Sequence, residues 1–211
     1  MGMTESQPRR GRPPLAEITD LRTRALGVIL RVGYQQASMS QIASEVGLSV
    51  RTLHRYFPAK ADIVWGGIER SLDALSDGLR HANGELPVIE AITAVVVAVF
   101  DQNTDDGAVD RARLRLIATT PELRAARPET FELWRAQLIG FIGDRLGEPA
   151  GSLVPWVMGA AVQTTITEAL AWWALHERTR GPGEVVERAL GSFNSVTAGL
   201  SPPVPSRRGQ R

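Results

Sequence analysis

Apolar residues recur every three or four positions along most of the chain, and no segment of useful length alternates apolar and polar residues as a half-buried strand would. The first apolar stripe begins near Glu17, runs to Val32 and ends at Gly33, which suits the left-handed backbone that closes a helix. A longer stripe predicts a single helix over residues 60–81. The pattern therefore predicts an all-α protein.

Between these two stripes the sequence predicts two short helices joined by a tight turn. Ser38 and Ser49 stand at N-cap positions, where a hydroxyl accepts from an otherwise unpaired backbone N–H, and Gln41 would complete a capping box with Ser38. Gly47 would end the first of the two helices. The inward-facing residues would be Met39, Ile42, Ala43 and Val46 in the first helix and Leu53, Tyr56 and Phe57 in the second.

A set of residue types occurs at fixed spacing across this region, and no insertion or deletion is needed to align it with a known pattern. The residues are Gly33-Tyr34, Ser38, Ile42-Ala43, Val46-Gly47, Ser49, Thr52-Leu53, Tyr56-Phe57 and Lys60. The pattern resembles the DNA-binding domain of the TetR family of one-component bacterial regulators, and it covers roughly the first third of the chain. His54 departs from the family, which usually has a Tyr there whose hydroxyl reaches a phosphate. The resemblance implies a helix-turn-helix head whose second short helix enters the major groove.

The same resemblance implies which residues contact DNA. Outward residues of the second short helix would meet base edges. Lys60, at the start of the next helix, would meet a phosphate together with the backbone N–H groups of that helix end. The expected set is Ser38, Ser49, Val50, Arg51, Thr52, His54, Arg55, Tyr56 and Lys60.

Residues 1–14 are polar and rich in proline, and they cannot bury enough apolar surface to fold alone. Within them, Arg10-Gly11-Arg12-Pro13 resembles the core of an AT-hook, in which two Arg side chains enter a narrow A/T-rich minor groove. The alternative is a solvated charged tail. Because the segment adjoins the predicted head, we expect Arg9, Arg10 and Arg12 to contact DNA.

Charge is distributed unevenly, although the net charge of the 211 residues is only +1. Residues 1–60 hold nine Lys or Arg and four Asp or Glu, whereas residues 61–206 hold 12 and 19. A basic N-terminal part is typical of a nucleic-acid-binding face, and the acidic remainder disfavours a second one. We expect a flexible basic arm at 1–14, a DNA-binding domain at 15–60, a helical ligand-binding and dimerisation domain at 61–200, and a disordered tail at 201–211.

Glycine and proline divide the body into about five helices, with breaks at residues 84–87, 103–107, 121, 128, 147–151 and 180–183. Residues 86–100 are nearly all apolar, so we expect them to be buried centrally.

The last two helices, over residues 153–177 and 184–200, contain small residues that permit close helix packing. In the TetR family these two helices pair with those of a second copy, so the resemblance implies a homodimer. Packing within one chain would produce the same pattern. The interface residues expected are Trp156, Ala160, Trp172, Ala189 and Phe193.

Within the family, the body is similar to regulators associated with mycofactocin gene clusters, through YFPAKADIVWG at 56–66, RLRLIATTPELRA at 113–125 and FELWR at 131–135. This resemblance implies a long-chain acyl-CoA as effector, which needs an apolar tunnel and positive charge for its phosphates. The expected ligand-binding residues are Phe100, Arg113, Arg124, Trp134, Met158 and Glu168. Such large apolar residues are more often core than pocket, and Glu168 is more often solvated or ion-paired.

Catalysis has little support in the sequence. The chain lacks cysteine, its three His residues lie far apart, and it has no glycine-rich phosphate loop or H-E-x-x-H zinc motif. We therefore expect no catalytic residues, no cofactor and no bound metal. The absence of a signal segment, of a membrane-spanning run and of cysteine favours a cytoplasmic protein.

Three functional classes remain: a ligand-controlled repressor, a DNA-binding protein without a small-molecule ligand, and an interaction module that has lost its operator. Well over a hundred residues follow the predicted head, and a sensor needs them for a cavity and a dimer interface. The basic recognition helix is intact, which disfavours a lost operator. We expect a repressor that is released by a small lipophilic effector, with a drug-responsive efflux-type repressor as the alternative.

Overall fold

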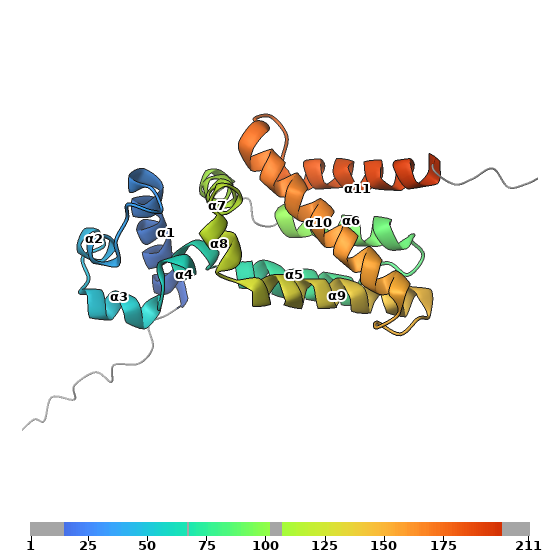
Figure 1. Ribbon diagram of the computed structural model, residues 1–211, viewed down its shortest axis with the longest axis horizontal. Coiled ribbons are helices and arrows are strands. Elements are labelled where there is room, and N and C mark those ends of the chain that lie inside the picture. The colour runs from blue at the N-terminus through green and yellow to red at the C-terminus, as the bar shows by residue number, and fades with distance from the viewer. Residues whose placement is uncertain (1–14, 67, 102–106, 200–211) are drawn as a thin grey trace, which may run out of the picture. The chain divides into compact units, whose positions relative to one another are not determined.

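The computed structural model describes residues 15–66, 68–101 and 107–199, and every regular element within those ranges is an α-helix (Figure 1). The all-α prediction is therefore confirmed. The chain divides into two compact units, and the boundary between them follows Gly66.

The described part of unit 1 consists of α1 (Leu15–Val32), α2 (Met39–Glu45), α3 (Val50–Tyr56) and α4 (Lys60–Trp65). Helix α2 packs against α1 and α3, and α4 packs against α1. Burial of a large apolar side chain stabilises a fold by roughly 1.5–3 kcal/mol, so the shared core fixes how α3 is held. The largest fully buried side chains of this core are Leu26, Ile29, Ile42, Leu53, Phe57 and Ile63.

The prediction of one helix over residues 60–81 is wrong, because the chain leaves the helical conformation at Gly66. Gly66 has φ −60° and ψ 132°, and the next helix begins at Ile68. A Cβ at position 66 would lie 2.0 Å from Nε of Arg22, so the glycine leaves the room that the Arg22 side chain occupies. Two consecutive glycines are also poor helix formers. The apolar stripe continues through this point, which is why periodicity alone missed the break.

The described part of unit 2 contains seven helices, two more than the body was predicted to have. One of the additional helices follows Gly66, and the other is the short helix that Pro121 begins. The seven are α5 (Ile68–Arg80), α6 (Val88–Asp101), α7 (Gly107–Thr119), α8 (Pro121–Ala125), α9 (Pro128–Leu146), α10 (Leu153–His176) and α11 (Pro182–Gly199).

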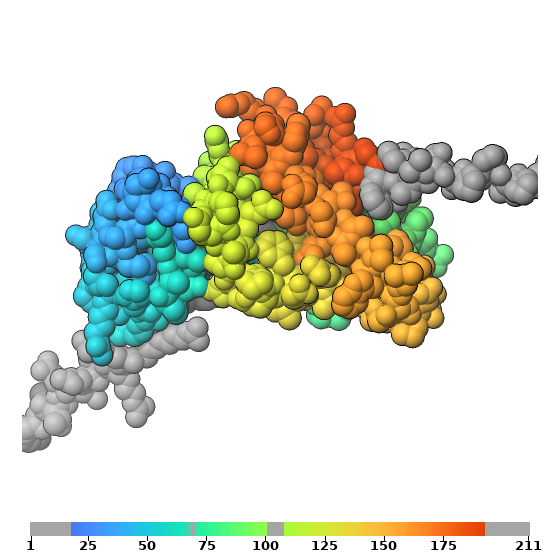
Figure 2. Space-filling view, viewed as in Figure 1, coloured from blue at the N-terminus to red at the C-terminus, as the bar shows by residue number. Residues whose placement is uncertain are grey.

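Helix α10 is central to the packing of unit 2. It packs against α7, α9 and α11, while α6 packs against α5 and α11. Helix α10 provides more residues to the core than any other helix, and one of its sides is closed off by its neighbours. In Figure 2 the same helix, in orange, runs across the visible face of unit 2 at the molecular surface. The predicted central burial of residues 86–100 holds for one face of α6, since Ile92 is fully buried while Ala94 is exposed.

Helices α9 and α10 approach closely because α10 has a glycine at the contact. A Cβ at Gly159 would lie 2.5 Å from Cγ1 of Ile139 and 3.2 Å from its backbone nitrogen. The buried Gln163 adds polar contacts at this interface, since its Nε2 donates to the carbonyl of Phe131 at 2.6 Å and its Oε1 accepts from Nε of Arg135 at 3.2 Å. The small residue at 159 thus serves packing within one chain.

The C-terminal end of α10 is held by a network of hydrogen bonds around Glu177. Its Oε1 accepts from the backbone N–H groups of Arg178 and Thr179, each at 2.8 Å, and from that of Arg180 at 3.3 Å. The Thr179 backbone and hydroxyl donors, followed by the Arg178 N–H, lower the pKa of Glu177 to about 2. The carboxylate therefore orders the turn that leads into α11.

Arg111 ties α7 to this same end of α10. Its guanidinium donates to the main-chain carbonyls of Glu177 and Trp173 and lies 4.1 Å from the centre of the Trp173 ring. The last carbonyls of a helix have no partner within the helix, so a cation there is favourable. The indole Nε1 of Trp173 also donates to the carbonyl of Arg180 at 2.8 Å. Helices α7 and α10 and the turn that leads into α11 are thereby joined at one point.

The depressed pKa of Glu177 makes part of the stability dependent on pH. Its folded-state pKa of about 2 is below the ordinary value of 4.5, so its contribution is complete above pH 4.5 and is lost as the pH falls towards 2. We expect Glu177→Gln to lower the free energy of unfolding at pH 7 and to flatten its decline between pH 4.5 and 3. Urea unfolding at these pH values measures both effects. The matched control is Glu184→Gln, an exposed ion-pair partner of Arg180, which should change little. If the free energy of unfolding fell equally steeply with pH in Glu177→Gln and in the unmodified protein, this stabilising role of the Glu177 carboxylate would be contradicted.

Candidate functional site

The turn between α2 and α3 fixes the direction in which α3 points. Gly47 has φ +76° and so takes the left-handed conformation that was predicted for it. Ser49 caps α3, because its Oγ accepts from the backbone N–H of Thr52 at 3.1 Å and lies 2.8 Å from the Thr52 hydroxyl. Leu53 and Phe57 are both buried and anchor the helix from its inner side. Tyr56, which was expected to face inward, is only half-buried.

The outer side of α3 presents the residues that the sequence singled out. Val50 is 38% exposed, and Arg51 and Arg55 are exposed as well. The guanidinium of Arg55 donates to the Tyr56 hydroxyl at 3.2 Å and lies 5.1 Å from the Tyr56 ring centre. Within the described residues, Arg51 has no hydrogen bond or ion pair, so its five donors face outward. A short, rigidly capped helix with this cationic surface can enter a major groove.

The cap of α2 forms only half of the predicted capping box. Ser38 Oγ accepts from the backbone N–H of Gln41 at 3.1 Å, as expected. The side chain of Gln41, however, donates to Glu45 at 3.4 Å instead of returning to Ser38. Glu45 also pairs with Arg31 of α1, so a charged partner on the next helical turn draws the amide away from the cap. That prediction is corrected in this respect.

Lys60 has a structural role that the sequence did not reveal. Its ammonium donates to the carbonyls of Tyr34 and Ala37, the latter at 2.8 Å, and lies 4.3 Å from the Tyr34 ring centre. Partial burial lowers the pKa of Lys60. The side chain thus ties α4 to the segment that precedes α2, and two of its three N–H donors are used in doing so. One donor remains for the expected phosphate contact.

His54 is turned towards its own chain. Its Nδ1 lies 3.0 Å from the carbonyl oxygen of Pro58. A carbonyl can only accept, so Nδ1 carries the hydrogen, and Nε2 of the neutral ring is left as an acceptor. An acceptor repels a phosphate oxygen, whereas the tyrosine usual at this position would donate to it. The arm residues Arg9, Arg10 and Arg12 lie outside the described residues.

The three apolar residues predicted to bind ligand lie at the border of the core of unit 2. Phe100, Trp134 and Met158 are partly buried, and each packs against the main hydrophobic cluster. They come from α6, α9 and α10. The structure therefore gives each of them a packing role, which the sequence analysis had named as the commoner reason for such residues.

The charged residues of the predicted ligand site all have partners. Arg113 is 15% exposed and pairs with Asp110 at 2.7 Å. Arg124 lies 4.0 Å from Oε1 of Glu168, and both side chains are exposed. The structure thus brings Arg124 and Glu168 together as a surface ion pair, which contributes little to stability.

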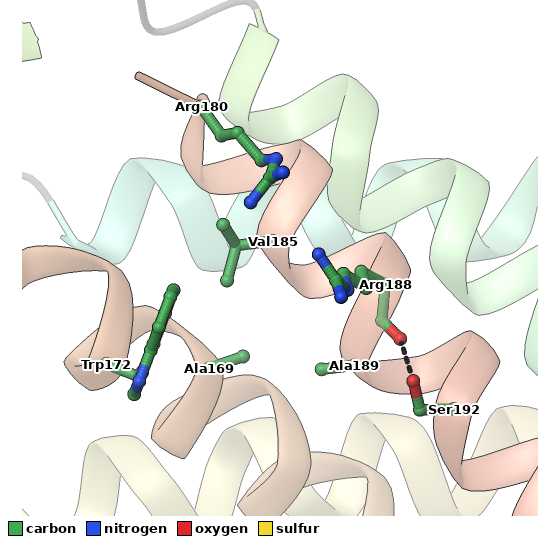
Figure 3. Close-up of a pocket in the computed structure, with 7 residues that line it drawn as sticks. All are labelled: Ala169, Trp172, Arg180, Val185, Arg188, Ala189 and Ser192. Carbon is green, nitrogen blue, oxygen red and sulfur yellow. Dashed lines mark hydrogen bonds between the residues drawn. The ribbon is translucent and has the colours of Figure 1, made fainter. Parts of the chain in front are cut away.

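Two of the predicted dimer residues line one groove between α10 and α11. The groove has a volume of about 370 Å³, and Trp172 and Ala189 face it from opposite helices (Figure 3). Trp156 is exposed and Ala160 is half-buried, and both lie nearer the start of α10. The side chain of Phe193 lies outside the described residues. The other residues of the groove are Ala169, Arg180, Val185, Arg188 and Ser192.

A larger apolar surface on α10 was not fully predicted. Of the nine large apolar side chains that are exposed among the described residues, six belong to this helix. We call these six side chains the α10 apolar stripe; they form two groups, Leu153, Val154, Trp156 and Val157 near the start of the helix and Trp172 and Leu175 near its end. The signal was present in the sequence, because large apolar residues occur on more sides of this helix than packing within one chain can cover.

The described residues contain no group of three or more His, Cys, Asp or Glu side chains that could hold a metal ion. In the same parts of the chain, no helix is long and apolar enough to cross a membrane.

Comparison with known families accounts for both units. Residues 21–64 match the bacterial regulatory proteins of the tetR family, and residues 86–199 match the MftR C-terminal domain. The second match spans more than half of the chain. The chain therefore belongs to the TetR family of DNA-binding transcriptional regulators and is not an enzyme. Its C-terminal domain is of the MftR type, as the resemblance at the sequence level implied.

Individual relatives agree with this assignment. MftR of Mycobacterium tuberculosis, named for transcriptional regulation of mycofactocin biosynthesis, is 27% identical over 169 residues, which are 80% of this chain and 83% of the relative. FadR of Thermus thermophilus, solved in complex with lauroyl-CoA, has a TM-score of 0.57 at 18% identity, covering 90% of this chain and 99% of that one. NalD, the secondary repressor of the MexAB-OprM multidrug efflux pump in Pseudomonas aeruginosa, has a TM-score of 0.63 at 15% identity, covering 85% and 95%. The two solved structures share the fold.

The orientation of His54 leads to a prediction for a regulator of this family. We expect His54→Tyr to strengthen DNA binding by on the order of 1 kcal/mol, because a phenol donates to a phosphate oxygen that the neutral imidazole repels. Fluorescence anisotropy with labelled operator DNA measures the gain in affinity. His54→Phe is the control, and an equal gain from Phe would rule out the hydroxyl contact.

Proposed function

We propose that two copies of this chain bind a near-palindromic operator and that a small lipophilic effector, with long-chain acyl-CoA as the first choice, releases the DNA. The observation that carries the DNA-binding part is the outer side of α3, where Arg51 stands exposed on a helix held by Leu53 and Phe57. In a dimer of this kind the two recognition helices lie about 34–36 Å apart, in successive major grooves.

The residues divide into those that read bases and those that position the helix. Arg51 and Thr52, with Val50 beside them, would meet base edges, although the Thr52 hydroxyl also contacts Ser49. The remaining N–H of Lys60 would meet a phosphate, and so would polar groups near the capping residues Ser38 and Ser49. Arg10 and Arg12 of the arm would enter the flanking minor groove. Phosphate contacts set affinity and its salt dependence, and base contacts set specificity.

The α10 apolar stripe supports the homodimer. Clusters of exposed large apolar side chains often mark an interaction site, and the groove beside Trp172 would provide a concave surface for a helix of the second copy. A two-fold axis would place the same stripe on both sides of the interface, so each copy would cover the apolar surface of the other. Trp156, Ala160, Trp172, Ala189 and Phe193 remain the residues proposed to lie there.

The division between base and phosphate contacts is testable with two substitutions. Arg51→Ala should cost roughly 1–3 kcal/mol at one base position in each half-site and relax specificity there. Lys60→Ala should weaken all sequences alike and reduce the salt slope. Protection assays on operator variants across a salt series, which also report two bound copies per operator, measure these effects. Thermal unfolding of Lys60→Ala must be recorded alongside, because its loss leaves two carbonyls without a donor. Equal loss of specificity from both changes would contradict the assignment.

The effector part rests on linkage between two binding equilibria. A ligand releases DNA only if it binds the DNA-incompetent conformation more tightly, and a 10- to 100-fold effect requires about 1.4–2.7 kcal/mol of coupling. An apolar chain buried against Phe100, Trp134 or Met158 would gain roughly 0.8 kcal/mol per CH₂. The MftR-type domain and the lauroyl-CoA complex of the FadR relative support an acyl chain as the first choice. The pairing of Arg113 and Arg124 with acidic residues leaves the site of the CoA head group open to experiment.

The chemical class of the effector can be tested by varying the length of an acyl chain. We expect acyl-CoAs to release the operator with a potency that rises about fourfold per added CH₂ until the apolar site is filled, because each CH₂ contributes roughly 0.8 kcal/mol. Gel-shift titration with acyl-CoAs of increasing length measures this, and CoA without an acyl chain is the control. Release by a cationic drug and by no acyl-CoA would indicate an efflux-type repressor. Release by neither would indicate a DNA-binding protein without a small-molecule ligand.

A further inference from the structure

Helix α9 carries two buried polar atoms that have no hydrogen-bond partner among the described residues. They are Nε1 of Trp134 and Oε1 of Gln137, and they do not pair with each other. Nearly all buried polar atoms in native structures find partners, because an unpaired one loses its hydration without compensation. Two such atoms three residues apart on one helix therefore need an explanation. We call them the orphan pair.

Trp134 and Gln137 lie on the same side of α9, because they are three residues apart in one helix. Residues three apart in a helix are neighbours, with Cβ atoms about 5–6 Å apart. One turn further along lie Leu138, which is fully buried, and Phe141, which packs against the core. Trp134 itself packs against the same cluster. The two unpartnered polar atoms thus belong to side chains that lie beside apolar residues of the core.

The chemistry of the two atoms defines what would satisfy them. An indole N–H only donates, and an amide oxygen only accepts. A carboxylate would suit Trp134 and be repelled by Gln137 Oε1, whereas an ammonium group would suit Gln137 and be repelled by the indole hydrogen. A neutral group with adjacent acceptor and donor, such as a secondary amide, satisfies both atoms at once. The apolar border requires that this group be attached to an apolar body.

We infer that the orphan pair is the polar recognition element of the effector site, and that it selects a lipophilic ligand carrying a neutral amide-like group. This inference rests on the proposed effector function and adds to it the chemical class of the ligand. It also assigns Gln137 to the ligand site, beside the Trp134 that the sequence suggested.

Two probes that differ by a single donor test the inference on the full-length chain. N-methyldecanamide offers a carbonyl acceptor and an N–H donor, and N,N-dimethyldecanamide offers the acceptor alone. Isothermal titration should show that the unmodified protein binds the first about tenfold more tightly, the effect of one hydrogen bond to a buried group. Gln137→Met should abolish this difference. Trp134→Phe should weaken both probes alike, by about tenfold, because both use the indole N–H.

A matched pair of variants separates the inference from a structural role for the glutamine. Gln163 is also buried on a neighbouring helix, but both ends of its amide are bonded, to Phe131 and to Arg135. Gln163→Met should therefore lower the midpoint of thermal unfolding, whereas Gln137→Met should leave it unchanged or raise it, since no bond is lost. A lower midpoint for Gln137→Met would show that the atom is satisfied in the folded protein and would overturn the inference.

The remaining outcomes distinguish this inference from the proposed function. Two results would refute the requirement for an N–H donor on the ligand. One is equal binding of the two amides by the unmodified protein, and the other is weaker binding of the dimethyl probe to Gln137→Met than to the unmodified protein. If acyl-CoA still released the operator in that case, the proposed function would stand and only the inference would fail. If neither the probes nor any acyl-CoA bound, the proposed effector function would itself be wrong.

Discussion

Unit 2 depends on α10, a largely apolar helix that carries large apolar side chains both on the side its neighbours cover and on the side they leave exposed. One side of α10 is covered within the chain, where Gly159 admits the backbone of α9 and Ile166 is fully buried. The other side carries the α10 apolar stripe, which a single copy leaves in water. The Glu177 network and Arg111 fix the end of the helix from which Trp172 and Leu175 project. Folding of one copy thus leaves apolar side chains exposed that the proposed dimer would bury.

The elements that the sequence predicted best are those determined by residues close together in the chain. The start of α2 after Ser38, the left-handed Gly47 and the start of α3 after Ser49 all follow from hydrogen bonds or dihedral angles within four residues. The all-α class follows equally from local periodicity. Periodicity failed at Gly66 because it records which residues are apolar and not whether the backbone stays helical between them. The space taken by Arg22 is set by packing across 44 positions of sequence, which no local pattern contains.

Side-chain partners were harder to predict than helices, because several candidates compete for each polar group in three dimensions. The side chain of Gln41 could bond to the backbone of Ser38 or to the carboxylate of Glu45. It bonds to Glu45, which also pairs with Arg31. Lys60 was assigned to a phosphate from its place at a helix start, yet two main-chain carbonyls more than 20 residues earlier take two of its donors. In both cases the residue type was informative about chemistry, but its partner depended on the packing of α1, α2 and α4. Lys60 thus has a role in the fold that does not depend on its proposed contact with DNA.

The orphan pair raises the question of why a stable core would keep polar atoms without partners. Apolar burial supplies affinity at roughly 0.8 kcal/mol per CH₂, but it depends on area and distinguishes poorly among lipids of similar length. A buried donor and acceptor discriminate strongly, because a ligand that lacks the matching group leaves them unpaired in a medium where water cannot compensate. Their cost falls on the free protein and is relieved only when a matching ligand binds. A sensor of the proposed kind would accept a somewhat less stable empty state, and the hydrogen bonds regained on binding would favour release of DNA only if the DNA-incompetent conformation alone allowed them to form.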